Sequence, residues 1–221
     1  MYEYDIAQGI EDGYLAACAI QRAQASLDPE GLTREQVAQQ GPTDARTGLR
    51  VAEEDLGDLY ASNSFEGKLQ LPDRVREMCA DLFEHLLATG GPEQKTVVFC
   101  VRDSHSDRVA NELNNLYARW CQESGRRPAS HYAFKCTSAS NGQDLLPDLK
   151  GTNRDYFVAT TVDLLSTGVN VPALRNVVFF KYMKSPILFY QMVGRVTRID
   201  MATEKLMFRI YDYTNATRLF G

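Results

Sequence analysis

The chain has 221 residues, of which 44% are hydrophobic and 24% are charged, and its formal net charge at pH 7 is −5. This composition is typical of a globular protein with one large domain, or with one domain and an extension. A chain this acidic does not bind nucleic acid through its overall charge, so any contact with nucleic acid must be local or shared with another domain.

The sequence also disfavours a membrane protein and a secreted protein held together by disulfide bonds. No apolar run approaches the roughly 20 residues that span a bilayer, and the first residues do not form a secretory signal. The five cysteines are scattered without a Cys-x-x-Cys pair, and the three histidines do not group near them. We therefore expect a cytoplasmic protein without a zinc site or a disulfide framework.

Residues 1–70 are interpreted as an N-terminal extension or inter-domain segment. A turn that contains Gly9 and Gly13 leads into a stretch, 16–26, that could form an extra strand. Thr33 and Gln36 have the spacing of a capping box, which predicts a short helix within 32–40. The polar stretch 41–50 contains Gly and Pro and is expected to be a loop.

Residues 71–221 alternate between helical and strand patterns. Pro72 begins a helix that extends to Ala88, because apolar residues recur there with the helical period. Ser104 is predicted to cap a second helix, with Asp107 at its third position. Strands are predicted over 96–101, 131–136, 155–160, 176–180 and 205–213, with a loop over 138–151, a short helix over 162–166 and another helix from Ser185-Pro186. This alternation predicts an α/β domain with a mainly parallel central sheet.

The segment from Gln191 to Arg198 holds two arginines three residues apart. Residues at i and i+3 share a helix face, so Arg195 and Arg198 can reach one target together. Two guanidinium groups on one face suit a polyphosphate whose charge grows during bond breaking. Gly194 carries no Cβ, so a ligand or a second domain can approach the backbone there. The alternative is a solvated helix end with two ordinary arginines.

A second segment follows a predicted buried strand. Thr160 and Thr161 lie where that strand ends, and a turn with Asp163, Thr167 and Gly168 follows. Ligands of parallel sheets sit at the carboxyl ends of the strands, and hydroxyls and glycine amides in such turns can hold phosphate oxygens. Taken alone, this segment is better explained as a plain turn with Asp163 as a cap.

Three other features have simpler structural explanations. Ser104, His105 and Asp107 are chemically a nucleophile, a base and an acid, but at a helix start they point to different faces, so capping is favoured over a catalytic triad. Trp120 lies on the apolar face of its helix and is expected in the core. A lysine pair, Lys181 and Lys184, could touch DNA phosphate or remain solvated.

Together, the two segments resemble the second motor domain of superfamily-two helicases and translocases. Gln191 to Arg198 matches their sixth motif, Gln-x-x-Gly-Arg-x-x-Arg, at all four fixed positions, and 160–172 resembles their fifth motif. Asp163 and Gly168 fit that fifth motif, whereas Asn170 stands where the family often has Asp. Further stretches are similar to the restriction (R) subunit of type I restriction-modification enzymes: 4–15, 112–117, 163–168, 189–195 and 211–217.

The resemblance implies a RecA-like three-layer αβα fold for 71–221 and a share in an ATP site between two RecA-like domains. Arg195 and Arg198 would be catalytic arginine fingers. The nucleotide contacts implied by the resemblance are Gln191, Gly168, Asn170 and Gly194, and the implied contacts with double-stranded DNA are Thr160, Thr161, Asp163 and Thr167.

The partners are implied in the same way. The sequence has no phosphate loop, no magnesium-binding motif and no defensible nuclease constellation. In the resembled family these belong to an upstream RecA-like domain and a nuclease domain, so ATP and Mg²⁺ would be shared with a parent chain, and the chain alone is expected to be inactive. Modification and specificity subunits would complete the restriction complex. The alternatives are the equivalent domain of another superfamily-two DNA or RNA helicase, or a non-catalytic α/β scaffold.

Overall fold

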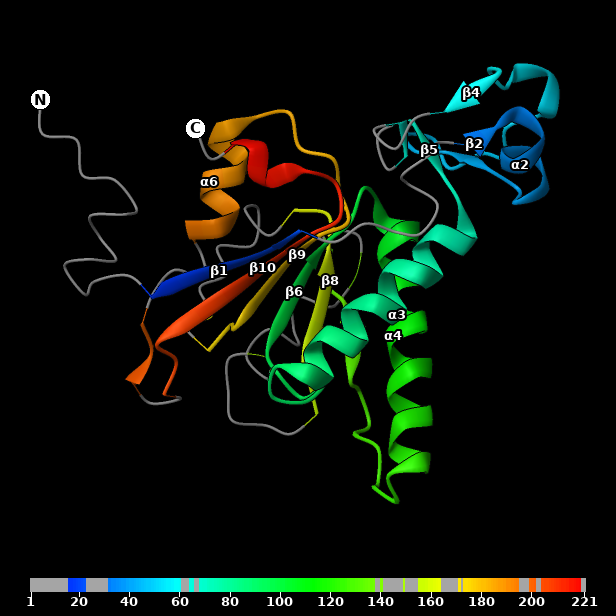
Figure 1. The fold of residues 1–221 in the computed structure, drawn as a ribbon. Coiled ribbons are helices and arrows are strands. Elements are labelled where there is room, and N and C mark those ends of the chain that lie inside the picture. Colours follow the sequence, from blue (N-terminus) through cyan, green and yellow to red (C-terminus); the bar gives the residue numbers. More distant parts are fainter. Residues whose placement is uncertain are drawn as a thin grey trace, which may run out of the picture.

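The computed structural model describes residues 16–22, 32–60, 64–65, 68–137, 140, 149, 155–163, 171, 173–194, 199–201 and 204–219. Its centre is a sheet of six parallel strands in the order β1-β10-β9-β6-β8-β7 (Figure 1). In chain order these strands are β1 (Ala17–Arg22), β6 (Thr96–Phe99), β7 (Ala133–Lys135), β8 (Val158–Thr161), β9 (Asn176–Phe179) and β10 (Met207–Asp212). The predicted parallel sheet is confirmed, with strands one to three residues shorter at most ends.

Three central strands, β6, β8 and β9, are buried at every position. The apolar runs of β6 and β9 are what a strand needs when helices cover both faces of a parallel sheet, whereas β8 also buries two threonines. Sequence segments with this pattern therefore occupy the middle of the sheet.

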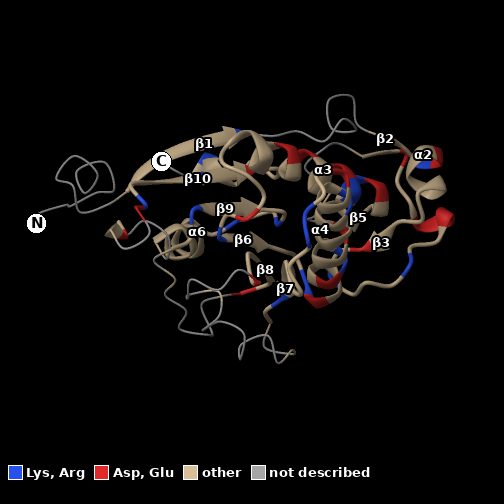
Figure 2. Ribbon diagram, turned by 90° about the horizontal axis from the view of Figure 1, so that it is seen from below, with Lys and Arg blue, Asp and Glu red and all other residues tan. Residues whose placement is uncertain are grey.

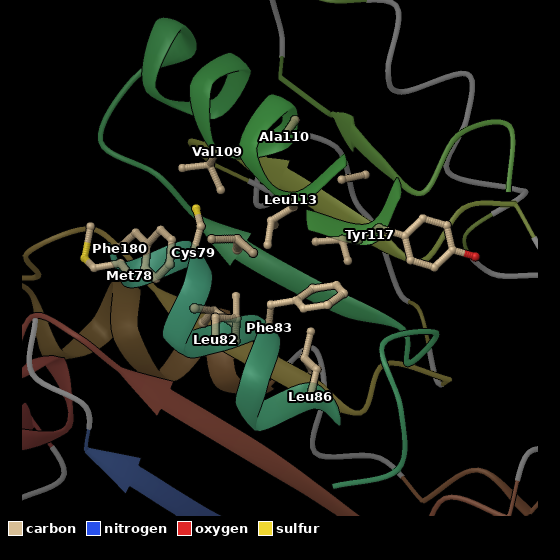
Figure 3. Close-up of a cluster of buried hydrophobic side chains, with 14 of the residues drawn as sticks. Met78, Cys79, Leu82, Phe83, Leu86, Val109, Ala110, Leu113, Tyr117 and Phe180 are labelled. Carbon is tan, nitrogen blue, oxygen red and sulfur yellow. The ribbon is translucent and has the colours of Figure 1, made fainter. Parts of the chain in front are cut away.

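One face of the sheet is covered by two long helices, α3 (Pro72–Ala88) and α4 (Asp103–Glu123). Their apolar faces meet each other and the sheet (Figure 3). This α3/α4 cluster includes Met78, Cys79, Leu82, Phe83, Leu86, Val109, Ala110, Leu113, Tyr117 and Phe180. Trp120, predicted to be a core residue, is only partly buried and packs against the margin of this cluster.

The opposite face is covered by α6 (Pro186–Gly194). Phe189 of this helix lies against Phe179 of β9, which stacks on Phe99 of β6, with ring centroids 5.3 Å and 5.5 Å apart. Helices on both faces make three layers, which confirms the predicted αβα fold.

The stretch near the N-terminus that was predicted as an extra strand belongs to the central sheet. β1 pairs in parallel with β10, from Ala17 opposite Met207 to Arg22 opposite Asp212. The strand that we placed in the N-terminal extension is therefore an edge strand of the central sheet. Local sequence does not reveal this pairing, because its partner lies at the other end of the chain.

Residues 32–71 form a small subdomain at one end of α3 (Figure 1). The predicted capping box is present, with Thr33 Oγ accepting from the Gln36 amide at the start of α2 (Arg34–Gln39). The expected loop 41–50 contains a short strand. The remaining elements are β2 (Leu32–Thr33), β3 (Thr43–Asp44), η1 (Glu53–Asp55), β4 (Leu59–Tyr60) and β5 (Leu69–Gln70), around a core of Leu32, Val37, Leu56, Phe65, Leu69 and Leu71.

The predicted cap of α4 is wrong. The helix begins at Asp103 with Arg102 at the N-cap position, and Ser104 is exposed. Lys135 explains the difference, because its Nζ donates to the carboxylates of both Asp103 and Asp107 at 2.8 Å. A contact from the neighbouring strand β7 thus holds the first helical turn in place of a serine cap. Most of the predicted loop 138–151 and of the predicted helix 162–166 lies outside the described residues.

The small subdomain meets the sheet through one close contact. Gly48 has a φ of +77°, and a Cβ at this position would lie 1.5 Å from a guanidinium nitrogen of Arg102. Arg102 also donates from Nε to Gln70 Oε1 at 3.4 Å. Arg102, three residues after β6, is therefore held by the subdomain, and a larger residue than glycine at position 48 would have to displace its guanidinium group.

We expect Gly48→Ala to lower the free energy of unfolding by about 1–3 kcal/mol, because it adds left-handed strain and displaces Arg102. In an Arg102→Ala background the steric part should vanish and only the strain remain. Chemical denaturation of the four proteins of this double-mutant cycle measures the difference. Equal losses in both backgrounds would show that Arg102 moves aside without cost.

Candidate functional site

The end of β8 places the two predicted threonines inside the protein. Thr160 and Thr161 are both 0% exposed. Thr160 Oγ donates to the Ser106 carbonyl in α4 at 3.0 Å, whereas the Thr161 hydroxyl has no hydrogen-bond partner among the described residues. Asp163, two residues further, is exposed. Neither hydroxyl is presented to a ligand in this conformation, so the predicted DNA contacts of these residues stay predictions, with Asp163 placed best for one.

The two threonines differ in a way that can be tested. Thr160→Val should cost about 1 kcal/mol of stability by removing a buried hydrogen bond, whereas Thr161→Val should be neutral or stabilising by up to about 1 kcal/mol. A buried polar group without a hydrogen-bond partner in a native protein calls for an explanation. One explanation is that the Thr161 hydroxyl binds a ligand in another conformation of the protein. If Thr161→Val leaves the chain stable but lowers DNA-stimulated ATP hydrolysis when placed in the intact parent chain, that result would indicate such a role. Thermal unfolding of the chain and ATPase assays of the parent chain, each with both variants, distinguish the two residues.

Lys181 follows β9 and is half-buried. Its Nζ donates to the Val162 carbonyl at 3.2 Å, directly after Thr161. Burial lowers the pKa of Lys181, and the nearby Asp163 carboxylate acts in the opposite direction. Lys184, by contrast, is exposed. The lysine pair is therefore split between an internal contact and the surface.

The helix α6 presents one exposed face. Ser185 caps it as predicted, since its Oγ accepts from the Leu188 amide at 3.4 Å. Phe189, Met192 and Val193 are buried, while Gln191 and Gly194 are exposed one turn apart. A Cβ on Gly194 would meet nothing within 4 Å. The helix contains no charged residue, and the charges of the domain gather on α3, α4 and the small subdomain (Figure 2).

Several predicted site residues cannot be placed. Arg195, Arg198, Thr167, Gly168 and Asn170 lie outside the described residues, so their predicted roles stay predictions. The surface over Gly194 beside Gln191 is open. Among the described residues there is no group of three His, Cys, Asp or Glu side chains that could hold a metal ion.

The Ser-His-Ser-Asp segment forms no triad. His105 is buried and its Nδ1 accepts from the Val101 amide at 3.2 Å. Burial lowers the pKa of His105 to about 3, and the positive charges of Arg108, Arg102 and Arg74 act in the same direction. A histidine that stays neutral down to that pH is a core residue, which agrees with the preference for a structural explanation.

Asp212 is a structural residue that the sequence analysis missed. It is 2% exposed at the end of β10, and its carboxylate accepts from the amides of Thr214, Ala216 and Thr217 and from the Thr217 hydroxyl. Arg22 of β1 donates to the same hydroxyl at 3.3 Å. An Asp followed two and five residues later by Thr is the available signal, since Asx turns use such side chains. The turn leads into η6 (Ala216–Leu219) and gives the 211–217 stretch a structural role.

Among the described residues, no helix is long and apolar enough to cross a membrane.

Comparisons with known proteins place both candidate segments in one family region. The model of the family described as helicase conserved C-terminal domain matches residues 77–200. The chain is 30% identical over 224 residues to the EcoAI endonuclease subunit of a type I restriction enzyme from Escherichia coli, covering 100% of this chain and 26% of that protein. It is 33% identical over 153 residues to the EcoKI endonuclease subunit from Escherichia coli strain K12, covering 67% and 12%. The chain thus spans about a quarter or less of these relatives.

Solved structures give the same result for the fold. A fragment of a putative HsdR subunit of a type I restriction enzyme from Vibrio vulnificus YJ016 superposes with a TM-score of 0.66 at 28% identity, over 97% of this chain and 35% of that one. The Type ISP restriction-modification enzyme LlaBIII, solved bound to DNA, superposes with a TM-score of 0.52 at 16% identity over 92% of this chain and 12% of that one, which shows a shared fold only.

Proposed function

Because the chain belongs to the helicase conserved C-terminal domain family and resembles the R subunits of type I restriction enzymes, we propose that it is the second motor domain of an ATP-dependent DNA translocase subunit. The observation that carries this proposal is the exposed face of α6, where Gln191 and Gly194 lead directly into Arg195 and Arg198. The parent chain would supply the rest of the motor.

The arginines have the role of completing an ATP site. Buried Phe189 and Val193 fix the rotation of α6, so the face with Gln191 and Gly194 stays exposed. Arg195 follows Gln191 by four positions, and Arg198 follows Gly194 by four positions. Side chains at this spacing share a face when the chain is helical. Guanidinium groups there stabilise charge on the γ-phosphate when an upstream RecA-like domain, which holds Mg²⁺ and the other phosphate contacts, closes on this one.

The loop after β8 is proposed to follow the DNA. After a change of conformation that exposes the buried threonines, Thr160, Thr161, Asp163 and Thr167 would line the path of double-stranded DNA, with the hydroxyl groups contacting its phosphate backbone independently of sequence. This suits a motor that moves over any sequence, while separate modification and specificity subunits of a cytoplasmic restriction complex select the site. The acidic net charge is compatible with this role, since only the track needs positive groups.

ATP hydrolysis by the intact parent chain tests the proposal. Linear double-stranded DNA is expected to stimulate hydrolysis, RNA is not, and the 221-residue chain alone should be silent. Stimulation by RNA in place of DNA would favour another superfamily-two helicase. Hydrolysis that no nucleic acid stimulates, with no effect of deleting this domain, would leave an α/β scaffold as the remaining explanation.

A further inference from the structure

Lys181 connects two parts of the proposed site that are separate in the sequence. β6 lies between β8 and β9 in the sheet. The Lys181 side chain starts beyond the end of β9 and reaches the Val162 carbonyl beyond the end of β8, so it crosses the carboxyl end of β6. The contact joins the loop proposed to follow DNA to the segment that leads into α6.

The main chain of Lys181 is fixed from the other side. Thr214 Oγ donates to the Lys181 carbonyl at 2.9 Å, and the Thr214 amide donates to Asp212 at 3.1 Å. Asp212 is itself held in the turn after β10. Lys181 is therefore anchored by its backbone to β10 and by its ammonium to the loop after β8, five residues before α6 begins.

A partly buried ammonium group has a desolvation cost that an apolar side chain at position 181 would not have. Lys181 is half-buried, and a partly buried charge requires compensating groups, which here include the Val162 carbonyl and the nearby Asp163 carboxylate. Because these two groups belong to the segment after β8, any ligand that moves this segment or draws the Asp163 charge away also acts on Lys181.

We propose that Lys181 is a positioning residue that couples the loop after β8, proposed above to contact DNA, to the segment that leads into α6, and through it to the arginines that follow α6 in the sequence. The inference rests on the proposed function and adds a route by which DNA stimulates hydrolysis. Lys181 touches neither ATP nor the reacting atoms in this scheme.

A matched control lies at the opposite edge of the sheet. Lys95 directly precedes β6, and its Nζ donates to the Tyr156 carbonyl just before β8 at 2.6 Å. The chemistry is the same, an ammonium bound to a backbone carbonyl across two strands. Because this contact is at the amino ends of the strands, it cannot link the loop after β8 to α6.

The test compares Lys181→Met and Lys95→Met in the intact parent chain. We expect Lys181→Met to lower the ratio of DNA-stimulated to DNA-free ATP hydrolysis by about tenfold, the order of one hydrogen bond to a charged group. DNA-free hydrolysis should remain within about twofold, and Lys95→Met should keep the full ratio. Unfolding midpoints of both variants show whether their stability losses match.

The results separate the inference from the proposed function. A retained ratio in Lys181→Met, or equal falls in both variants, would overturn the coupling role. If Arg195→Ala in the same assay abolishes hydrolysis while Lys181→Met behaves as wild type, the motor assignment stands and only the coupling fails; if Arg195→Ala changes nothing, the proposed function itself fails. Should Lys181→Met not fold, Thr214→Val decides, because it frees the Lys181 backbone: a reduced ratio supports the role and an unchanged ratio overturns it.

Discussion

Replacing Arg195 with alanine in the intact parent chain is expected to lower DNA-stimulated ATP hydrolysis by at least about 10²-fold. An arginine that stabilises the transferring phosphoryl group contributes roughly 10³–10⁵ to the rate in related motors. The expected fall is set at the lower limit because Arg198, three residues further, can compensate in part. Steady-state hydrolysis at saturating ATP and DNA measures it.

Arg119→Ala is the control for this experiment, since Arg119 is an exposed arginine of α4 outside the proposed site. It should hydrolyse ATP at the wild-type rate. DNA binding by Arg195→Ala should also be retained, because the arginine is assigned to the phosphate and not to the track. An unchanged rate in Arg195→Ala would mean that the two arginines are surface residues, and the motor mechanism would have to be abandoned.

Elements whose signal is local were predicted well from sequence. Pro72 and the helical period of the residues after it define α3, because a proline fits the first turn and the apolar stripe must face a core. The apolar runs of β6 and β9 predict buried strands, since both faces of those strands meet helices. The capping box at Thr33 is likewise a short-range pattern with its own hydrogen bonds.

Features that depend on distant partners were not predictable. Ser104 is chemically suited to cap a helix. In the structure, Lys135 of the neighbouring strand β7 instead donates to the carboxylates of Asp103 and Asp107 in the first turn of α4. β1 was separated from the domain because its partner β10 follows almost the whole chain later. Pairings of this kind leave no periodic trace in either segment.

In the candidate site, too, local features were predictable from the sequence and contacts between distant residues were not. The sequence identified the segment that carries Gln191 and Gly194, and the structure leaves both exposed on α6. It did not show that Thr160 turns inward to Ser106, because facing is set by the register of β8 between its neighbours. Nor could it place Lys181 beside Val162. That contact spans the end of β6, which lies between β8 and β9 in the sheet, and the strand order is not visible in the sequence.

The largest stability loss is expected from Phe179→Ala. Phe179 is 0% exposed and its ring lies between Phe99 of β6 and Phe189 of α6. Truncating a fully buried phenylalanine removes its apolar contacts and leaves a cavity, which costs about 3–5 kcal/mol. Since domains are stable by only about 5–15 kcal/mol, a large share of the free energy of unfolding should be lost. Guanidinium denaturation of the chain measures the change.

Ile187→Ala is the matched control, because Ile187 lies two residues before Phe189 on α6 but is 70% exposed. Its free energy of unfolding should stay within about 0.5 kcal/mol of wild type. A loss below about 1 kcal/mol for Phe179→Ala would contradict the packing of α6 on the sheet. That packing fixes which face of α6 is exposed, so the same result would remove the support for placing Arg195 and Arg198 beside Gln191 and Gly194. The stability measurement therefore tests the geometric premise of the motor mechanism without requiring ATP, DNA or the parent chain.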